Sequence, residues 1–136
     1  AAVVRSWLPA DDDAGAGAGG VRAAAPETIA ILVPDRHRRG QVVTALGEQG
    51  LEVRAVDREE AGPGRPLVMT MHRAKGLEFT HVLLLDANAL LDPRRRYHET
   101  LDETALADWR LRERSLLYVA ATRARDVLAV MPTAAR

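Results

Sequence analysis

The sequence predicts an α/β domain built on a mostly parallel sheet. Residues 28–34 (TIAILVP) and 81–86 (HVLLLD) are short, continuous apolar runs, which are typical of strands buried on both faces. Elsewhere apolar residues recur at three- and four-residue intervals, the spacing of one helix face. Strands and helices alternate along the chain, and 136 residues are enough for one domain.

In the first part of the chain, residues 1–8 (AAVVRSWL) have a short apolar face and predict the tail of a helix. Residues 9–26 (PADDDAGAGAGGVRAAAP) are of low complexity and predict a flexible linker. The strand 28–34 follows and ends at a proline. A helix is predicted over 36–49, with Gly50 as its stop. We therefore divide the chain into 1–26, helix tail plus linker, and 27–136, the folded domain.

In the second part, a Gly- and Pro-rich loop is predicted at 58–66, and a charged, irregular stretch at 88–108. A helix is predicted over 109–124, where apolar residues fall at helical spacing. Further strands are predicted at 51–56, 67–71, 81–86 and 127–131.

Composition excludes several classes of protein. The chain has no cysteine, so disulfides, thiolate catalysis and cysteine zinc sites are ruled out. Its formal net charge is zero, which leaves open a local basic stripe for nucleic acid. The four histidines show no spacing typical of metal ligands. No apolar run approaches the roughly 20 residues that span a bilayer, so we expect no membrane partner and a cytoplasmic location. Because the chain starts without methionine, we expect a fragment of a longer protein.

Lys75 is the only lysine among nineteen basic residues, and it lies in the loop TMHRAKGLEF, 70–79. This loop follows a predicted strand, and in open α/β sheets ligands bind at the carboxyl ends of strands. Gly76 allows a tight turn or a close approach to a ligand. Lys75 suits phosphate, Glu78 suits sugar hydroxyls, and His72 and Arg73 suit nucleic acid. The alternative is a surface loop with ordinary charges.

Two segments resemble motifs of the UvrD/Rep-type superfamily 1 helicases. Residues 68–85 (VMTMHRAKGLEFTHVLLL) resemble motif V, T-x-H-x-[SA]-K-G-L-E-[FW], and meet every fixed position. Residues 112–130 (RERSLLYVAATRARDVLAV) resemble motif VI, with Ser115 where the family usually has arginine. The two motifs occur in the family's order and spacing.

A third resemblance is weaker. Residues 28–46 (TIAILVPDRHRRGQVVTAL) lie where motif IV belongs, but Gly40 falls at the family's phosphate-contacting arginine. Either Arg38 or Arg39 takes over that contact, or both are solvated charges at the start of a helix.

The resemblance implies a RecA-like, three-layer domain of the P-loop NTPase type. The pattern G-x-x-x-x-G-K-[ST] does not occur here, so the chain is similar to the second half only. In the family, ATP lies between two RecA-like halves, and the first half supplies the phosphate-binding loop and the carboxylates for Mg²⁺. We therefore expect ATP and Mg²⁺ as cofactors, and a phosphate-loop-bearing N-terminal half as a partner.

The resemblance also assigns roles to residues. Arg123 is similar to the family's arginine finger, the catalytic group that stabilises charge on the γ-phosphate. Glu78 resembles the residue that meets the ribose, and Lys75 and Gly76 shape the same ATP-binding loop. The alternative role for Lys75 is an ion pair with an acidic residue of the other half. Thr70, His72 and Arg73 are implied contacts of single-stranded or partly duplex DNA.

The resemblance implies that this chain is the C-terminal half of an ATP-dependent DNA helicase or translocase. We expect the isolated chain to be inactive. The interval where many relatives insert an accessory subdomain is short here, which makes processive unwinding less expected than translocation. The alternatives are a non-catalytic RecA-like module that binds nucleic acid or a partner, and an unrelated nucleotide-binding regulatory domain. Tyr118 is predicted to lie in the core, and Trp7 and Trp109 are predicted to pack rather than to stack on bases.

Overall fold

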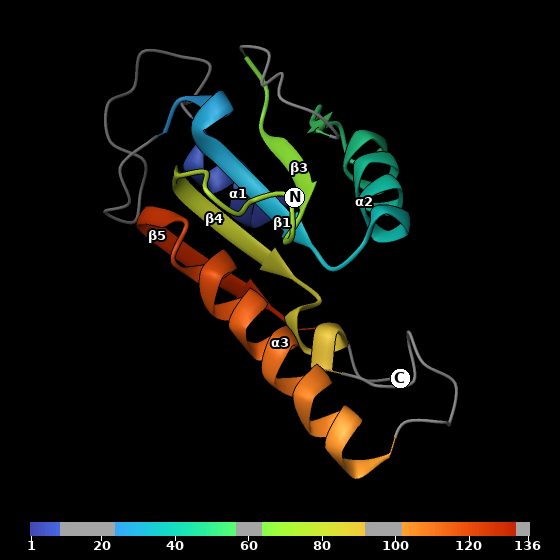
Figure 1. Cartoon of the computed structure of the whole chain (residues 1–136). Coiled ribbons are helices and arrows are strands. Elements are labelled where there is room, and N and C mark those ends of the chain that lie inside the picture. Colours follow the sequence, from blue (N-terminus) through green and yellow to red (C-terminus); the bar gives the residue numbers. More distant parts are fainter. Residues whose placement is uncertain (9–23, 57–63, 92–101, 133–136) are drawn as a thin grey trace.

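The computed structural model describes residues 1–8, 24–56, 64–91 and 102–132, and these ranges form a five-stranded sheet with parallel pairing throughout (Figure 1). The predicted α/β class is confirmed. The strand order is β2-β3-β1-β4-β5. The strands are β1 (Ile29–Val33), β2 (Arg54–Ala55), β3 (Leu67–Thr70), β4 (Phe79–Leu85) and β5 (Ala124–Met131). Because all strands run the same way, their carboxyl ends share one edge of the sheet and their amino ends share the other.

The central strand β1 is buried along its whole length, as its apolar run predicts. It pairs with β3 so that Val33 aligns with Thr70, and with β4 so that Ile29 aligns with His81. Alternate residues point to opposite faces. Ile31 therefore joins the core on one face of the sheet and Leu32 joins the core on the other.

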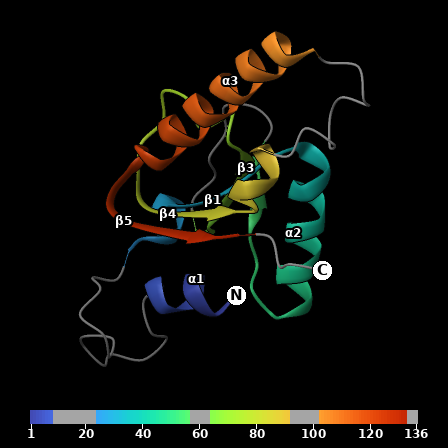
Figure 2. The same ribbon diagram turned by 90° about the horizontal axis from the view of Figure 1, so that it is seen from below.

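Two helices cover the first face of the sheet, α1 (Ala2–Trp7) and α2 (Arg36–Glu48) (Figure 2). Trp7 is buried with its ring centroid 5.1 Å from that of His81. The backbone N–H of Ala24 donates to the carbonyl of Trp7 at 2.9 Å, which fastens α1 to the chain that enters the sheet. The Arg5 guanidinium donates to the carbonyl of Gln49, at the end of α2.

Both ends of α2 follow local chemistry. The Asp35 carboxylate accepts a hydrogen bond from the Arg38 backbone N–H at 2.8 Å, a side-chain cap at the first turn. Gly50 follows the C-cap with φ +79°, a left-handed conformation that glycine adopts readily. The predicted stop at Gly50 is therefore confirmed.

The second face is covered on one side by α3 (Glu103–Ala121), which lies across the sheet from α1 (Figure 2). Ala120, Leu116 and Leu117 pack with Val82 and Leu84 of β4 in the second core cluster. The rest of this cover comes from the loop 71–78, through buried Met71 and Ala74.

Several predicted boundaries are wrong. The Asp102 carboxylate accepts from the Ala105 N–H at 2.7 Å and starts α3 at Glu103, inside the stretch predicted to be irregular. The helix ends at Ala121, because the Arg123 carbonyl accepts from the Phe79 N–H at 2.9 Å and Ala124 pairs with Phe79 in the sheet. Strands β4 and β5 therefore begin earlier than predicted, and the short 3-10 helix η2 (Ala87–Leu91) follows β4.

The start of the domain also differs from the prediction. Ala24 is buried and η1 (Pro26–Thr28) is a short 3-10 helix, so the linker predicted over 9–26 does not reach residue 26. Residues 9–23, and residues 58–63 of the predicted loop 58–66, lie outside the described part. Only Arg54–Ala55 of the predicted strand 51–56 forms a strand.

The three predicted packing aromatics do not all behave alike. Trp7 and Trp109 are buried, as predicted. Tyr118 is 72% exposed, so its placement in the core is wrong. It lies on the outer side of α3, while Ala120 and its neighbours face the sheet.

Candidate functional site

The loop 71–78 carries the predicted chemistry and crosses the second face of the sheet from one edge to the other. It leaves β3 at Thr70, at the carboxyl edge, and enters β4 at Phe79, at the amino edge. Met71 anchors its start through a 2.9 Å hydrogen bond to the carbonyl of Val33. The prediction that HRAKGLEF, 72–79, lies at the carboxyl ends of the strands is therefore right only for the start of the loop. Strands β3 and β4 run parallel on either side of β1, so the connection between them must return to the opposite edge.

The residues predicted to contact DNA lie at the carboxyl edge. The Thr70 hydroxyl accepts from the Arg73 N–H at 3.3 Å, and the Thr70 carbonyl accepts from the same N–H at 3.0 Å. His72 is exposed. The Nε atom of Arg73 is buried without a hydrogen-bond partner in the described part of the chain. The turn thus holds the Thr70 hydroxyl within the fold and leaves the His72 imidazole open to a ligand.

Lys75 and Gly76 lie midway along the loop, and both are exposed. Gly76 has φ +84°, and no atom lies within 4 Å of the position that a Cβ would take. Its glycine requirement therefore comes from backbone conformation and not from crowding. The Leu77 N–H donates to the Ala74 carbonyl at 3.0 Å and closes the turn around these two residues.

Glu78 and Arg123 both lie at the amino edge, where Glu78 follows Leu77 and the Leu77 carbonyl accepts a hydrogen bond from Arg123. The Arg123 guanidinium donates through Nε to the Val119 carbonyl at 3.1 Å, and through Nη1 to the Leu77 carbonyl at 3.4 Å. The second of these bonds joins the motif VI segment that follows α3 to the end of the motif V loop. The Glu78 carboxylate lies nearby, since it contributes, after Asp126, to raising the pKa of Arg125. Arg125 itself is exposed and bonded to Asp126, as expected for a solvent-facing arginine.

The arginines proposed for motif IV both have partners within the fold. Arg38 forms an ion pair through Nε with the buried carboxylate of Asp86, which follows β4. Arg39 donates to the carbonyl of Val56 at 3.2 Å. Gly40 is exposed on α2, and a Cβ at this position would have open space around it. The interpretation of Arg38 and Arg39 as merely solvated charges is wrong.

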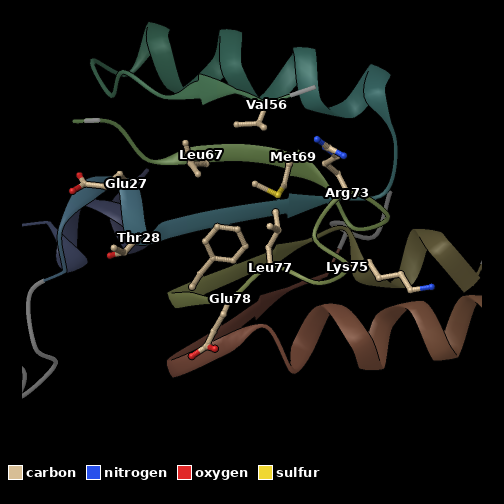
Figure 3. A pocket seen from close by; sticks show the side chains of 10 residues that line it. Glu27, Thr28, Val56, Leu67, Met69, Arg73, Lys75, Leu77 and Glu78 are labelled. Carbon is tan, nitrogen blue, oxygen red and sulfur yellow. The ribbon is translucent and has the colours of Figure 1, made fainter. Parts of the chain in front are cut away.

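A hollow of about 440 Å³ opens on the second face beside the loop (Figure 3). Its middle is apolar, and its charged residues divide into carboxylates toward the amino edge and cations toward the carboxyl edge (Figure 3). It is lined by Glu27, Thr28, Val56, Leu67, Met69, Arg73, Lys75, Leu77, Glu78 and Phe79.

Two residues of this region were missed from the sequence. Asp86 directly follows a buried strand, and an acidic residue in that position was a usable signal for a role at the carboxyl edge. Leu77 is 42% exposed although it is a large apolar residue, and no sequence pattern distinguishes it from a core leucine.

A parallel α/β sheet in which the motif V loop is bonded to the motif VI segment is the arrangement expected of a UvrD-like helicase C-terminal domain. The family of UvrD-like helicase C-terminal domains matches residues 58–134, and the chain belongs to this family. Among solved structures, the chain is similar to the C-terminal domain of a possible DNA helicase from Lactobacillus plantarum WCFS1, with 25% identity and a TM-score of 0.53. The match covers 77% of this chain and 55% of that one.

A comparison with curated proteins finds no match. Within residues 1–8, 24–56, 64–91 and 102–132, no helix has the length and apolar character needed to cross a membrane. The same ranges contain no group of three histidine or acidic residues that could hold a metal ion.

Proposed function

We propose that this chain is the second RecA-like half of an ATP-dependent DNA helicase or translocase, in which Arg123 completes the ATP site. The observation that carries the proposal is the fastening of Arg123 to the Leu77 carbonyl, next to Glu78, at one edge of the sheet. A guanidinium is always charged and presents several donors in a plane, so it suits the oxygens of a γ-phosphate. ATP then bridges this edge and a first half that carries the phosphate loop and the Mg²⁺ ligands.

At this edge Glu78 accepts hydrogen bonds from the ribose hydroxyls, and Gly76 permits the tight turn that brings the loop to the nucleotide. Lys75 is exposed at the rim of the hollow, so it is available to a phosphate or to an acidic residue of the first half. Arg123 stabilises the charge that builds on the transferred group, an effect worth about 10³–10⁵ in rate in related phosphoryl-transfer systems.

The opposite edge is proposed to hold single-stranded DNA through His72, Thr70 and Arg73. The exposed imidazole of His72 and the partly buried guanidinium of Arg73 can donate to phosphate oxygens. Because one loop of eight residues joins the two edges, a shift of Glu78 toward the nucleotide is transmitted along the loop to His72. This gives ATP turnover a physical route to the DNA contacts.

The proposal is tested by Arg123→Ala and Arg123→Lys in the complete two-half protein, with DNA-stimulated ATP hydrolysis as the assay. We expect both variants to lose about 10³-fold or more in kcat, because lysine cannot reproduce the planar donor set. Arg125→Ala is the matched control, since that arginine is two residues away, exposed and paired with Asp126. Thermal unfolding of each variant separates loss of the finger from loss of the fold.

Near-normal turnover in Arg123→Ala would remove Arg123 from the mechanism and favour the non-catalytic module. The isolated chain is expected to hydrolyse no ATP, and hydrolysis by a pure sample would contradict the assignment to the second half.

The DNA edge is tested separately by His72→Ala, with affinity for a single-stranded oligonucleotide measured at fixed salt. We expect weaker binding, while His37→Ala, an exposed histidine on α2, leaves the affinity unchanged. Equal affinities in the two variants would exclude His72 from the DNA contact.

A further inference from the structure

Leu77 is an exposed apolar side chain at the mouth of the apolar hollow. Its neighbours in the loop, Met71 and Ala74, are buried, whereas Leu77 is 42% exposed. Figure 3 shows the Leu77 side chain directed toward Met69, across the middle of the hollow. Large apolar side chains grouped around a concavity are typical of surfaces that bind a partner.

The sheet beneath the hollow is covered unevenly. On the first face, α1 and α2 together form the cover, and their core reaches β1, β3 and β4. On the second face, α3 packs near β4 and β5, and among the residues that the structure describes only the loop 71–78 extends toward β3. Parallel sheets are normally covered on both faces. The hollow therefore marks a part of the second face that a further element can cover.

The hollow and the candidate arginine finger share one wall. The Leu77 carbonyl accepts from Arg123 Nη1, and the Phe79 N–H donates to the Arg123 carbonyl. Leu77 and Phe79 both line the hollow. A domain that brings a nucleotide phosphate to Arg123 therefore approaches residues 77–79, which form one side of the hollow.

The charges at the amino edge of the hollow indicate which side chains a docking partner would need. Glu27 comes from η1 and Glu78 from the end of the loop, and both line this end (Figure 3). Arg73 and Lys75 line the other end. An apolar projection with basic groups toward the amino edge complements this pattern.

Resting on the proposed function, we propose that the hollow beside Leu77 is a docking site for the first RecA-like half. An apolar projection of that half, flanked by basic side chains, enters the hollow when ATP draws the two halves together. Leu77 then packs against the apolar projection and stabilises the state in which the two halves are together, while Arg123 contacts the nucleotide itself.

The absence of cysteine from this chain allows a direct test by thiol labelling in the complete two-half protein. The variants are Leu77→Cys and, as a matched control, Leu128→Cys, because both leucines are 42% exposed and Leu128 lies on the edge strand β5. Labelling rates are measured with a maleimide reagent, relative to the parent protein, with and without a non-hydrolysable ATP analogue. We expect the analogue to slow labelling at position 77 at least tenfold and to leave position 128 unchanged.

Equal labelling at position 77 with and without the analogue would overturn the proposal, as would full protection before the analogue is added. The second outcome would mean that a permanent element fills the hollow. Leu77→Ser provides an independent readout, with an expected loss of about tenfold in affinity for the analogue and none for Leu128→Ser. The Arg123→Ala assay reports on the proposed function alone. If Arg123→Ala loses turnover as expected but labelling at position 77 does not respond to the analogue, only the docking site is refuted.

Discussion

Replacing Arg38 by alanine is expected to destabilise the isolated chain by about 2 kcal/mol. The substitution leaves the Asp86 carboxylate without its ion pair at a position that is only 7% exposed. Breaking a buried pair by removing one partner costs roughly 3–5 kcal/mol, and an exposed pair is worth about 0.2–1 kcal/mol. The Arg38 side chain is 37% exposed and Asp86 has further interactions, so an intermediate value applies.

Urea unfolding followed by tryptophan fluorescence measures this cost, since Trp7 and Trp109 are both buried and report on the fold. With a slope of about 1.5 kcal/mol per molar urea, a loss of ~2 kcal/mol lowers the midpoint by about 1.3 M. Arg65→Ala is the control, because its 3.1 Å pair with Glu52 is exposed on both sides and is expected to contribute under about 0.5 kcal/mol.

A double-mutant cycle decides whether the pair itself is responsible. Asp86 has φ +54°, and asparagine tolerates this left-handed conformation better than other residues, so Asp86→Asn removes the charge with little backbone strain. We expect Arg38→Ala to cost at least about 1 kcal/mol less in the Asp86→Asn background. The same cost in both backgrounds would refute the reasoning and leave Arg38 free for the phosphate contact considered for motif IV.

Three further substitutions test the fold by the same urea titration. Ile31→Ala removes a fully buried side chain of the central strand and is expected to cost about 3–4 kcal/mol; a cost under 1 kcal/mol would show that the core rearranges. Asp35→Ala removes the cap of α2 and should cost about 1 kcal/mol, whereas no change would mean that water replaces the cap. Gly76→Ala places a Cβ at φ +84° and should cost about 1–2 kcal/mol, so an unchanged midpoint would place the strain elsewhere.

The interior strands and the α/β class were predictable because burial on both faces leaves a continuous apolar run, as in β1. The boundary between α3 and β5 was not. Apolar spacing continues through Ala124, but the hydrogen bond from Phe79 to the Arg123 carbonyl, far away in sequence, draws Arg123 and Ala124 out of the helix. Local periodicity contains no information about such a distant partner.

The candidate site was predictable residue by residue but not in its arrangement. Motifs V and VI identified Glu78 and Arg123, and the structure brings the segments that carry them together. The separation of Thr70 and His72 from Glu78, at opposite edges, depends on the order and direction of strands β3 and β4, which a motif does not encode. The exposure of Tyr118 depends on which side of α3 meets the sheet. The assigned roles of these residues stay predictions.

The hydrogen bond between the Ala24 N–H and the Trp7 carbonyl brings together two points of the chain that are seventeen residues apart. The described residues on either side of 9–23, Leu8 and Ala24, therefore lie close together. The entropic cost of closing such a segment grows only slowly with its length. This site should consequently accept peptide tags, affinity epitopes or fluorescent-protein fusions without disturbing the sheet, which makes it a convenient place to attach a reporter.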